Sequence, residues 1–280
     1  LYKIDHLSVS GHEAISSSGA SIKTTAKIED SVNFDLVLVV AGGDPSIFQN
    51  ERIFNWLRQI ARHGTRLGGV SGGPVILANA GLMEGRRMTL HWEHAEALSE
   101  ISPSLFIERS LYVIDRDRIT CAGGIAPLDM MYALQSEIHG SDFARKVSDW
   151  FIHTNVRPSS GPQRSGLIER FNIYNSAVIQ TIEMMENHIA DPLTLDQLAL
   201  LTSISSRQLN RLFKEKLGSS TMSVYRDLRL EKSRSFLLQT SLSITEISLS
   251  TGFSSSAHFS KAFSDKYNHS PSHYRSHSTN

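Results

Sequence analysis

The first 155 residues alternate between continuous apolar runs and apolar residues at helical spacing. Residues 34–41 (FDLVLVVA) predict a strand buried on both faces, ending at the Gly42-Gly43-Asp44 turn. Residues 47–61 then predict a helix, 65–70 a strand and 73–82 a second helix that stops near Gly81. Residues 118–123 and 126–140 repeat the strand and helix. This alternation predicts an α/β domain in which helices cover a parallel sheet.

The pattern changes after residue 153. The stretch TNVRPSSGPQRSG lacks periodicity and is typical of a linker, whereas the sequence from Asn175 onward has helical periodicity. Thr194 and Gln197 have the spacing of a capping box at a helix start. We therefore expect an α/β domain over residues 1–155, a linker over 156–174 and an all-helical domain over 175–280.

The helical part contains two helix-turn-helix patterns. In the first, TSIS at 202–205 is a short turn between two amphipathic helices, and in the second Gly252 marks the turn. The residues expected to pack between the helices are Leu195, Leu198, Ala199, Leu209, Leu212 and Phe213 in the first unit and Ile244, Ile247, Phe259 and Phe263 in the second. A helix of about 17 residues at 223–239, about 25 Å long, separates them. This length suits two recognition helices in successive major grooves, which lie about 34 Å apart.

The outward positions of the second helix in each unit carry side chains suited to phosphates and base edges. The DNA-binding candidates are Ser206, Arg207, Asn210, Arg211 and Lys214 in the first unit, and Ser255, Ser256, His258 and Lys261 in the second. Residues 205–275 hold eleven Lys or Arg against five Asp or Glu, a local charge of +6, although the whole chain has zero net charge. The alternative is an ordinary helical bundle whose basic face is only solvated.

These residues resemble the AraC/XylS family of transcriptional regulators over positions 176–275. The matching residues are Ala199, Ser205, Arg211, Phe213, Lys214, Gly218, Arg229, Leu230, Gly252, Phe253, Phe259, Phe263, Pro271 and Arg275. Thr221 stands where a Pro is usual, Ser233 and Ser248 replace alanines, and Asn268 replaces a Gly; an Asn can adopt the left-handed conformation at a helix end. The resemblance implies promoter DNA and RNA polymerase as partners.

Residues 69–73 (GVSGG) fit the G-x-S-x-G pattern of a serine hydrolase elbow. A hydrolase needs a histidine and a carboxylate beside the serine, and Ser71, Asp129 and His139 or His153 fill that order. Barely 85 residues separate Ser71 from the linker, which leaves little room for the later strands of an α/β-hydrolase. An active amidase or esterase fused to a DNA-binding domain is therefore the alternative reading of the elbow.

The segments around this elbow, LGGVSGGPVILANAGLMEGRRMTLHWEHAEAL and ITCAGGIAPLDMMYALQSEIHG, resemble the ThiJ/PfpI group of the class I glutamine amidotransferase-like fold, in its GlxA-type branch. The resemblance covers residues 1–155 and implies a flavodoxin-like parallel sheet. Catalytic relatives carry Cys followed by His at the elbow, where this chain has Ser71 and Gly72, and Cys121 lies in a predicted strand. We therefore expect no catalytic residue and no enzyme activity. The resemblance also implies that the family's first strand and helix precede this chain.

Without its nucleophile, the elbow predicts a ligand site at the strand ends. The candidates are Gly42, Gly43, Ser71, Gly72, Gly73, His91 and Trp92, in which backbone amides bind a carboxylate and the indole covers a cationic group. The alternatives are that the glycines serve only tight turns and that Trp92 is buried and structural. His91 and His94 lack a third ligand for a metal, so we expect neither metal nor cofactor.

The resemblance to GlxA-type regulators implies an effector such as glycine betaine, carnitine, a choline derivative or arginine. It favours an activator that acts as a homodimer through its sensor domain. A DNA-binding protein that responds to no ligand is the second alternative.

The apolar runs, the first residues and the cysteine count indicate where the protein acts. The longest apolar run, 36–41, is far below the roughly 20 residues of a membrane span, the chain begins without a signal-peptide pattern, and Cys121 is its one cysteine. We expect a cytoplasmic protein without membrane partners.

Overall fold

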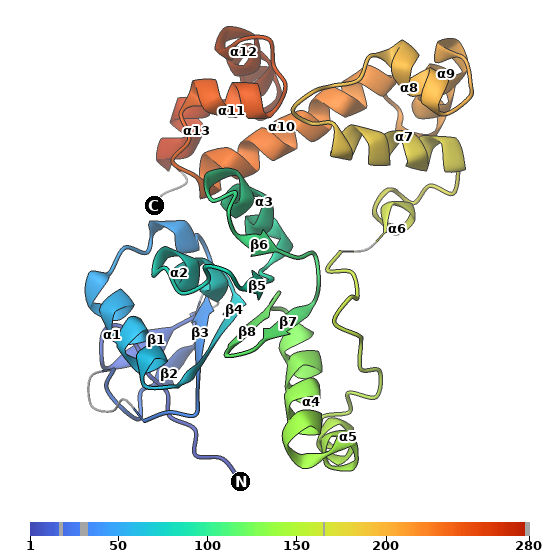
Figure 1. Cartoon of the computed structure of the whole chain (residues 1–280). Coiled ribbons are helices and arrows are strands. Elements are labelled where there is room, and N and C mark those ends of the chain that lie inside the picture. The colour runs from blue at the N-terminus through green and yellow to red at the C-terminus, as the bar shows by residue number, and fades with distance from the viewer. Residues whose placement is uncertain (17–18, 29–32, 165, 278–280) are drawn as a thin grey trace. The chain divides into compact units, whose positions relative to one another are not determined.

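The computed structural model describes residues 1–16, 19–28, 33–164 and 166–277. It contains two compact units, Leu1–Gln163 and Arg164–Asn280, which are considered separately below (Figure 1). The boundary between the two units in the sequence falls within the segment predicted as a linker. Position 165 of that segment, and the last three positions of the predicted helical domain, lie outside the described residues.

The first unit is built on a four-stranded sheet. Its strands lie in the order β3 (Leu36–Ala41), β4 (Arg66–Ser71), β8 (Arg118–Cys121) and β7 (Tyr112–Asp115). The first three are parallel, which confirms the predicted α/β fold, and β7 is antiparallel to β8. The pattern did not predict β7. A two-residue turn connects β7 to β8, and Arg116 in that turn has a φ of 57°, as tight hairpins require.

Helices and two short strand pairs complete this unit. They are β1 (Glu13–Ile15) with β2 (Ser21–Lys23), β5 (Arg87–Met88) with β6 (Phe106–Ile107), the 3₁₀ helix η1 (Pro45–Ile47), and helices α1 (Glu51–Arg62), α2 (Gly73–Asn79), α3 (Trp92–Ile101), α4 (Ala126–His139) and α5 (Ser141–Trp150). The helix predicted over 47–61 is wrong at its start. The Asn50 side chain accepts a hydrogen bond from the Ile53 N–H at 3.2 Å, and this cap starts α1 anew after η1.

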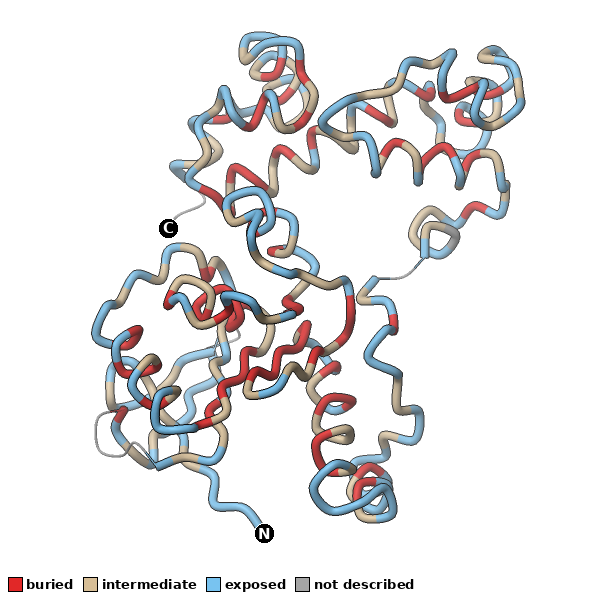
Figure 2. The backbone as a smooth tube through the Cα atoms, in the orientation of Figure 1, coloured by how far each residue is buried: buried red, intermediate tan, exposed pale blue. Residues whose placement is uncertain are grey.

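The sheet has a separate apolar core on each face. Leu67 of β4 packs in a cluster with α1 and α2, whereas Val70 contacts a cluster formed by Ile119, Cys121, Met130 and Leu134. Buried residues follow the central strands β4 and β8 (Figure 2). The prediction that the first strand is buried on both faces is wrong: Val37 is buried, but Val40 is 72% exposed. Within the described ranges, β3 stands at the end of the sheet order and pairs with β4 alone.

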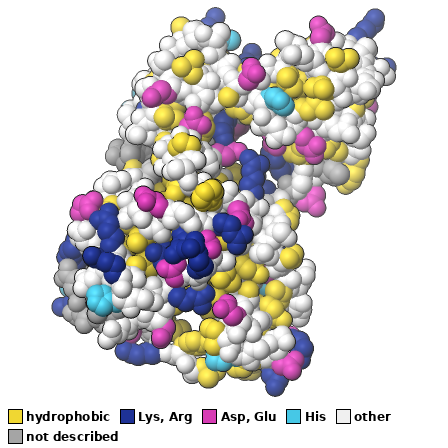
Figure 3. Space-filling view, in the orientation of Figure 1, with side chains coloured by type: hydrophobic (Ala, Val, Ile, Leu, Met, Phe, Trp, Pro, Cys, Tyr) yellow, Lys and Arg dark blue, Asp and Glu magenta, His cyan; other side chains and the backbone are white. Residues whose placement is uncertain are grey.

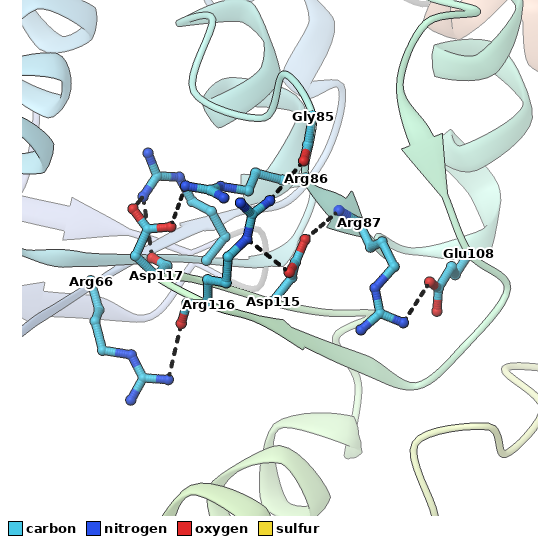
Figure 4. Close-up of polar contacts among 9 residues, drawn as sticks. Arg66, Gly85, Arg86, Arg87, Glu108, Asp115, Arg116 and Asp117 are labelled. Atoms are coloured by element: carbon cyan, nitrogen blue, oxygen red, sulfur yellow. Dashed lines mark hydrogen bonds and ion pairs between the residues drawn. The ribbon is translucent and has the colours of Figure 1, made fainter.

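Charged side chains of both signs gather on the surface of this unit (Figure 3). One such network fixes the ends of the sheet where β4 and β8 begin (Figure 4). Asp117 pairs with Arg86 at 2.7 Å and with Arg118 at 2.8 Å. Asp115 accepts a hydrogen bond from the Arg87 N–H at 2.8 Å, which lowers the pKa of that carboxyl group. The network therefore ties the β7–β8 hairpin to β5, at the end of β4 opposite Ser71.

The second unit is helical, as predicted. Its helices are α6 (Leu167–Phe171), α7 (Ser176–Asn187), α8 (Leu195–Leu201), α9 (Ser206–Leu217), α10 (Thr221–Gln239), α11 (Ile244–Ser250), α12 (Ser256–Tyr267) and α13 (Pro271–His277). The predicted capping box of Thr194 and Gln197 is confirmed, and Ser243 with Glu246 forms another. The connecting helix α10 starts two residues earlier than predicted, because Ser220 caps it. Its 19 residues span about 28 Å.

Both helix-turn-helix units pack as the apolar spacing predicts. Leu198 and Ala199 of α8 share a core with Leu209 and Phe213 of α9. In the second unit Ile247, Phe259 and Phe263 are each fully buried. Asn268 ends α12 with a φ of 60°, which confirms the left-handed conformation expected there. Among the described residues, no helix is long and apolar enough to cross a membrane.

Candidate functional site

Ser71 lies at the carboxyl end of β4, opposite Ala41 of β3. It has a φ of 61°, a left-handed conformation that is uncommon for a residue other than glycine. The Gly72 N–H donates to the Ala41 carbonyl oxygen at 3.0 Å, and the His91 N–H donates to the Ser71 carbonyl oxygen at 3.2 Å. The strained turn at Ser71 is thus fixed between β3 and the start of α3. We call Ser71 and the residues around it, Gly42 to Asp44, His91 to His94 and Gly123, the elbow site.

Gly123 brings the end of β8 to the same place. It has a φ of 86°, and a Cβ atom at this position would lie 2.6 Å from the Ser71 Cβ. Only glycine fits such an approach. Gly123 was not among the predicted site residues, although its place at the end of a predicted strand was a usable signal.

The predicted glycines divide into two groups. Gly73 meets the Val39 carbonyl oxygen so closely that no Cβ fits, and the Gly72 amide is already bonded to Ala41. Close packing and turn formation therefore account for Gly72 and Gly73, as in the alternative that the glycines serve only tight turns. Gly42 and Gly43 follow β3 directly, Gly43 with a φ of 64° and open space around the position of its missing side chain. These two remain candidates for ligand contact beside Ser71.

His91 and Trp92 begin α3 next to the elbow. His91 is the N-cap, and its Nδ1 accepts a hydrogen bond from the Glu93 N–H at 3.4 Å. The Trp92 ring lies 5.3 Å from the His91 ring, centroid to centroid, and the residue is 40% exposed. The structural alternative expected a buried Trp92, and this expected burial is wrong. An exposed indole beside the elbow can cover an apolar or cationic group.

His94 is a second residue of the elbow site that was not among the predicted ligand contacts. It is 7% exposed, its Nδ1 has no hydrogen-bond partner in the part of the chain that the structure describes, and its ring centroid lies 6.0 Å from that of His91. Burial lowers the pKa of His94, while the carboxylates of Glu93 and Asp44 act in the opposite direction. A neutral imidazole is therefore held close to Asp44, which caps η1 by accepting from the Ser46 N–H at 3.0 Å. The i, i+3 spacing of His91 and His94 was the available signal.

The groups that a serine hydrolase needs have other partners. Asp129 is fully buried and accepts three hydrogen bonds from Arg157, the shortest at 2.6 Å, with the His153 Nε2 at 3.3 Å. His139 contacts the Tyr2 hydroxyl at 2.7 Å. Over the described residues, no hydrogen bond joins the Ser71 hydroxyl to a histidine, and no cluster of three His, Cys, Asp or Glu has the arrangement of a metal site. Burial raises the pKa of Cys121 to about 11, so its thiol stays protonated near neutral pH.

The first helix-turn-helix unit presents a basic stripe on α9. Arg207, Arg211 and Lys214 are exposed at i, i+4 and i+7, so they lie on one face of the helix. Two other predicted DNA contacts have partners within the protein. The Ser206 hydroxyl donates to the Asp196 carboxylate at 2.5 Å, and the Asn210 Oδ1 accepts from the Thr221 N–H at 3.0 Å. The three cations are therefore the groups best placed for phosphates or bases.

The second unit presents a weaker charge. His258 and Lys261 are exposed on α12, one helical turn apart. The Ser255 hydroxyl caps α12 by accepting from the His258 N–H at 3.2 Å, and Ser256 is half-buried. The His258 ring packs edge-on against Phe253, 5.6 Å between centroids. Lys261 is thus the one exposed cation among the predicted contacts of this helix.

Two of the arginines that carry the family resemblance have structural roles. The Arg229 Nε donates to the Thr251 carbonyl oxygen at 2.8 Å, and its guanidinium lies 4.2 Å from the Phe253 ring centroid. Arg275 donates to the carbonyl oxygens of Leu237 and Leu242. Arg229 thus joins α10 to the end of α11, and Arg275 joins α13 to the end of α10 and to the loop before α11.

Comparison with known proteins agrees with this geometry. Residues 198–277 match the model of a helix-turn-helix domain, and residues 2–137 match the DJ-1/PfpI family. The chain is 42% identical to the HTH-type transcriptional regulator GlxA of Rhizobium meliloti over 97% of this chain and 84% of that one. It is 39% identical to the HTH-type transcriptional regulator CdhR of Pseudomonas aeruginosa over 97% and 81%.

A crystal structure of a ThiJ/PfpI family protein from Pseudomonas syringae is similar in fold alone. Its TM-score is 0.51 at 20% identity, over 66% of this chain and 74% of that one. The fold, the paired helix-turn-helix units and the two relatives lead to one assignment. The chain belongs to the AraC-type DNA-binding transcriptional regulators that carry a DJ-1/PfpI domain at the N-terminus.

Proposed function

We propose that this regulator binds a small nitrogenous metabolite at the elbow site and changes its occupancy of promoter DNA in response. The observation that carries the proposal is the elbow itself. Ser71 keeps the strained φ of 61°, yet its hydroxyl has no histidine partner among the described residues. A serine without a base is a poor nucleophile, whereas a rigid turn where strands end is a common ligand position.

The side chains around Ser71 favour a ligand with both a cationic and an anionic group. The exposed indole of Trp92 suits an onium group, and the strand-end amides near Gly42 and Gly43 suit a carboxylate. Glycine betaine, carnitine, a choline derivative and arginine have this chemistry. The neutral His94 adds a group that can donate or accept a hydrogen bond without adding charge.

We further propose that Arg207, Arg211 and Lys214 make the main DNA contacts. The i, i+4, i+7 stripe supports this, because it places three cations on one face of a capped second helix. His258 and Lys261 add contacts from α12 in the adjacent groove. Asn210 and Ser206 act chiefly within the protein, given their bonds to Thr221 and Asp196.

The assembly and the sign of regulation complete the proposal. We infer a homodimer formed through the N-terminal unit, which would pair two DNA-binding units on a repeated site. We infer activation through contact with RNA polymerase, in line with the family resemblance. The regulator acts in the cytoplasm, where promoter DNA and the metabolite are both available.

Isothermal titration of the full chain tests ligand binding. Glycine betaine, carnitine, dimethylglycine and arginine are titrated into the wild type, Trp92→Ala and Trp150→Ala. Trp150 is 85% exposed on α5, so its substitution is the matched control. We expect heat with one ligand, lost in Trp92→Ala and kept in Trp150→Ala. No heat with any ligand would leave a ligand-independent DNA-binding protein as the better account.

The rival enzyme reading has its own test. Amide and ester substrates are incubated with the wild type and with Ser71→Ala. Turnover that disappears in Ser71→Ala would show an active hydrolase and overturn the proposal that the elbow is catalytically inactive. We expect no turnover above the rate without protein.

A further inference from the structure

The residues that follow α5 do not leave the first unit at once. His153, Arg157, Ser159 and Gln163 each bond to it, so we call residues 153–163 the connector. Arg157 binds the buried Asp129, and the Leu111 N–H donates to the Ser159 carbonyl oxygen at 2.7 Å. Gln163 makes the last of these contacts, directly before the second unit begins at Arg164.

Gln163 is held by a dense set of hydrogen bonds. Its Nε2 donates to the carbonyl oxygens of Ser110 at 2.6 Å and Leu90 at 3.1 Å, and it lies 3.0 Å from the Thr89 Oγ1. Two of these partners are carbonyl oxygens, which only accept, so the orientation of the amide is settled. The Gln163 Oε1 is buried and has no partner in the part of the chain that the structure describes. A buried acceptor without a partner costs free energy while the connector is bound to the first unit, which we call the docked state. A small change can therefore release the connector.

Leu90 and His91 share the peptide group that connects Gln163 to the elbow site. The Leu90 carbonyl oxygen accepts from Gln163, and the His91 N–H donates to the Ser71 carbonyl oxygen at 3.2 Å. Because a peptide group is planar and rigid, a rotation that alters one of these hydrogen bonds alters the other. The hydrogen bond to the Ser71 carbonyl oxygen and the hydrogen bond from Gln163 therefore depend on the orientation of the same peptide group.

We propose that the Leu90–His91 peptide group, held between Ser71 and Gln163, couples occupancy of the elbow site to docking of the connector that leads into the DNA-binding unit. Gln163 acts as a positioning residue. The proposal rests on the proposed function for its ligand, but the contact itself can be tested without one. Coupling requires an element with two arrangements that both sites bias, and the docked and released connector are those two arrangements.

The first experiment measures amide hydrogen exchange in the full chain without ligand. Gln163→Leu and Gln163→Asn are compared with the wild type and with Gln59→Leu, a control on the exposed face of α1. Loss of the Gln163 contact is expected to speed exchange at the His91 N–H and at the Leu111 N–H, with no change in Gln59→Leu. Unchanged exchange at His91 in both Gln163 variants overturns the proposal, whether or not an effector is known.

The second experiment measures the effect of the effector on DNA affinity. In the wild type we expect a change of about fivefold or more in the Kd for DNA. In Gln163→Leu and Gln163→Asn we expect the ligand still to bind by titration, with an affinity shifted by the loss of coupling, but a DNA Kd that no longer responds to ligand. An undiminished response in these variants contradicts the coupling role. If the wild type itself does not respond, the proposed function fails, and the exchange experiment still decides whether Gln163 controls the His91 peptide group.

Discussion

Gly123 and Ser71 approach so closely that a Cβ at position 123 would lie 2.6 Å from the Ser71 Cβ. This contact joins the end of β8 to the end of β4 and determines the shape of the elbow site. It also requires a φ of 86° at Gly123, which side chains other than glycine rarely adopt.

Gly123→Ala is therefore expected to destabilise the first unit. The left-handed backbone costs about 1 kcal/mol or more, and the overlap with Ser71 adds about 1–3 kcal/mol. Gly124→Ala is the matched control, because Gly124 has a φ of 59° but open space around it. Thermal unfolding should show a larger loss for Gly123→Ala than for Gly124→Ala. Equal losses of thermal stability in the two variants would mean that the close approach of Gly123 to Ser71 does not contribute to stability.

Arg211→Ala should weaken DNA binding and flatten its dependence on salt. Removing one phosphate contact lowers the salt slope by about 1, and loss of a base contact costs about 1–3 kcal/mol. Lys216→Ala is the control, since Lys216 lies off the stripe and pairs with Glu215 at 2.8 Å. The measurement is the Kd on a selected DNA site at several salt concentrations. Equal effects of the two substitutions would refute the placement of the stripe against DNA.

Substitutions at Asn210 test whether this side chain stabilises the fold through its hydrogen bond to Thr221. Asn210→Ala removes the acceptor for the Thr221 N–H and should lower the free energy of unfolding by about 1–2 kcal/mol. Asn210→Asp keeps an acceptor there and should retain most of that stability. Chemical denaturation measures both. If Asn210→Asp and Asn210→Ala lose the same free energy of unfolding, the hydrogen bond from the Thr221 N–H does not contribute to stability.

The buried His94 predicts a stability that falls in acid. Burial lowers the pKa of His94 below its ordinary value of 6.5, so the unfolded chain takes up this proton first as the pH falls. The stabilisation is present above about pH 6.5 and decreases toward the lowered pKa, by at most about 1.4 kcal/mol per pH unit. Denaturation at pH 7.5 and 5.5 compares the wild type with His94→Asn and with His63→Asn, whose histidine is exposed. A pH dependence that is the same in His94→Asn and the wild type would contradict this origin.

Local pattern predicted the elements that depend on neighbouring residues. The capping box of Thr194 and Gln197, the turn before Ser205 and the left-handed Asn268 each follow from residues within one or two helical turns. The strands β4 and β8 likewise follow from their own composition. These elements alone place Ser71 at the end of a strand and Arg207 on an outward helix face.

Contacts between distant residues were not predictable in the same way. The close approach of Gly123 to Ser71 joins positions 52 apart in the sequence. The hydrogen bond from Gln163 to the Leu90 carbonyl oxygen joins positions 73 apart. Val40 is 72% exposed although it lies within a continuous apolar run, because the covering of a sheet face is decided by distant parts of the chain. The side chain of Asn210 has an outward helical position by spacing, yet it bonds to Thr221 because α10 begins beside it.

The central claim is that a metabolite at the elbow site changes DNA occupancy. Fluorescence anisotropy of the full chain on a selected DNA site, with and without each metabolite of the panel, tests it most directly. We predict that one metabolite changes the Kd for DNA about fivefold or more in the wild type and in Trp150→Ala, and leaves it unchanged in Trp92→Ala. A DNA Kd that no metabolite alters, or an equal response in Trp92→Ala, would contradict the claim.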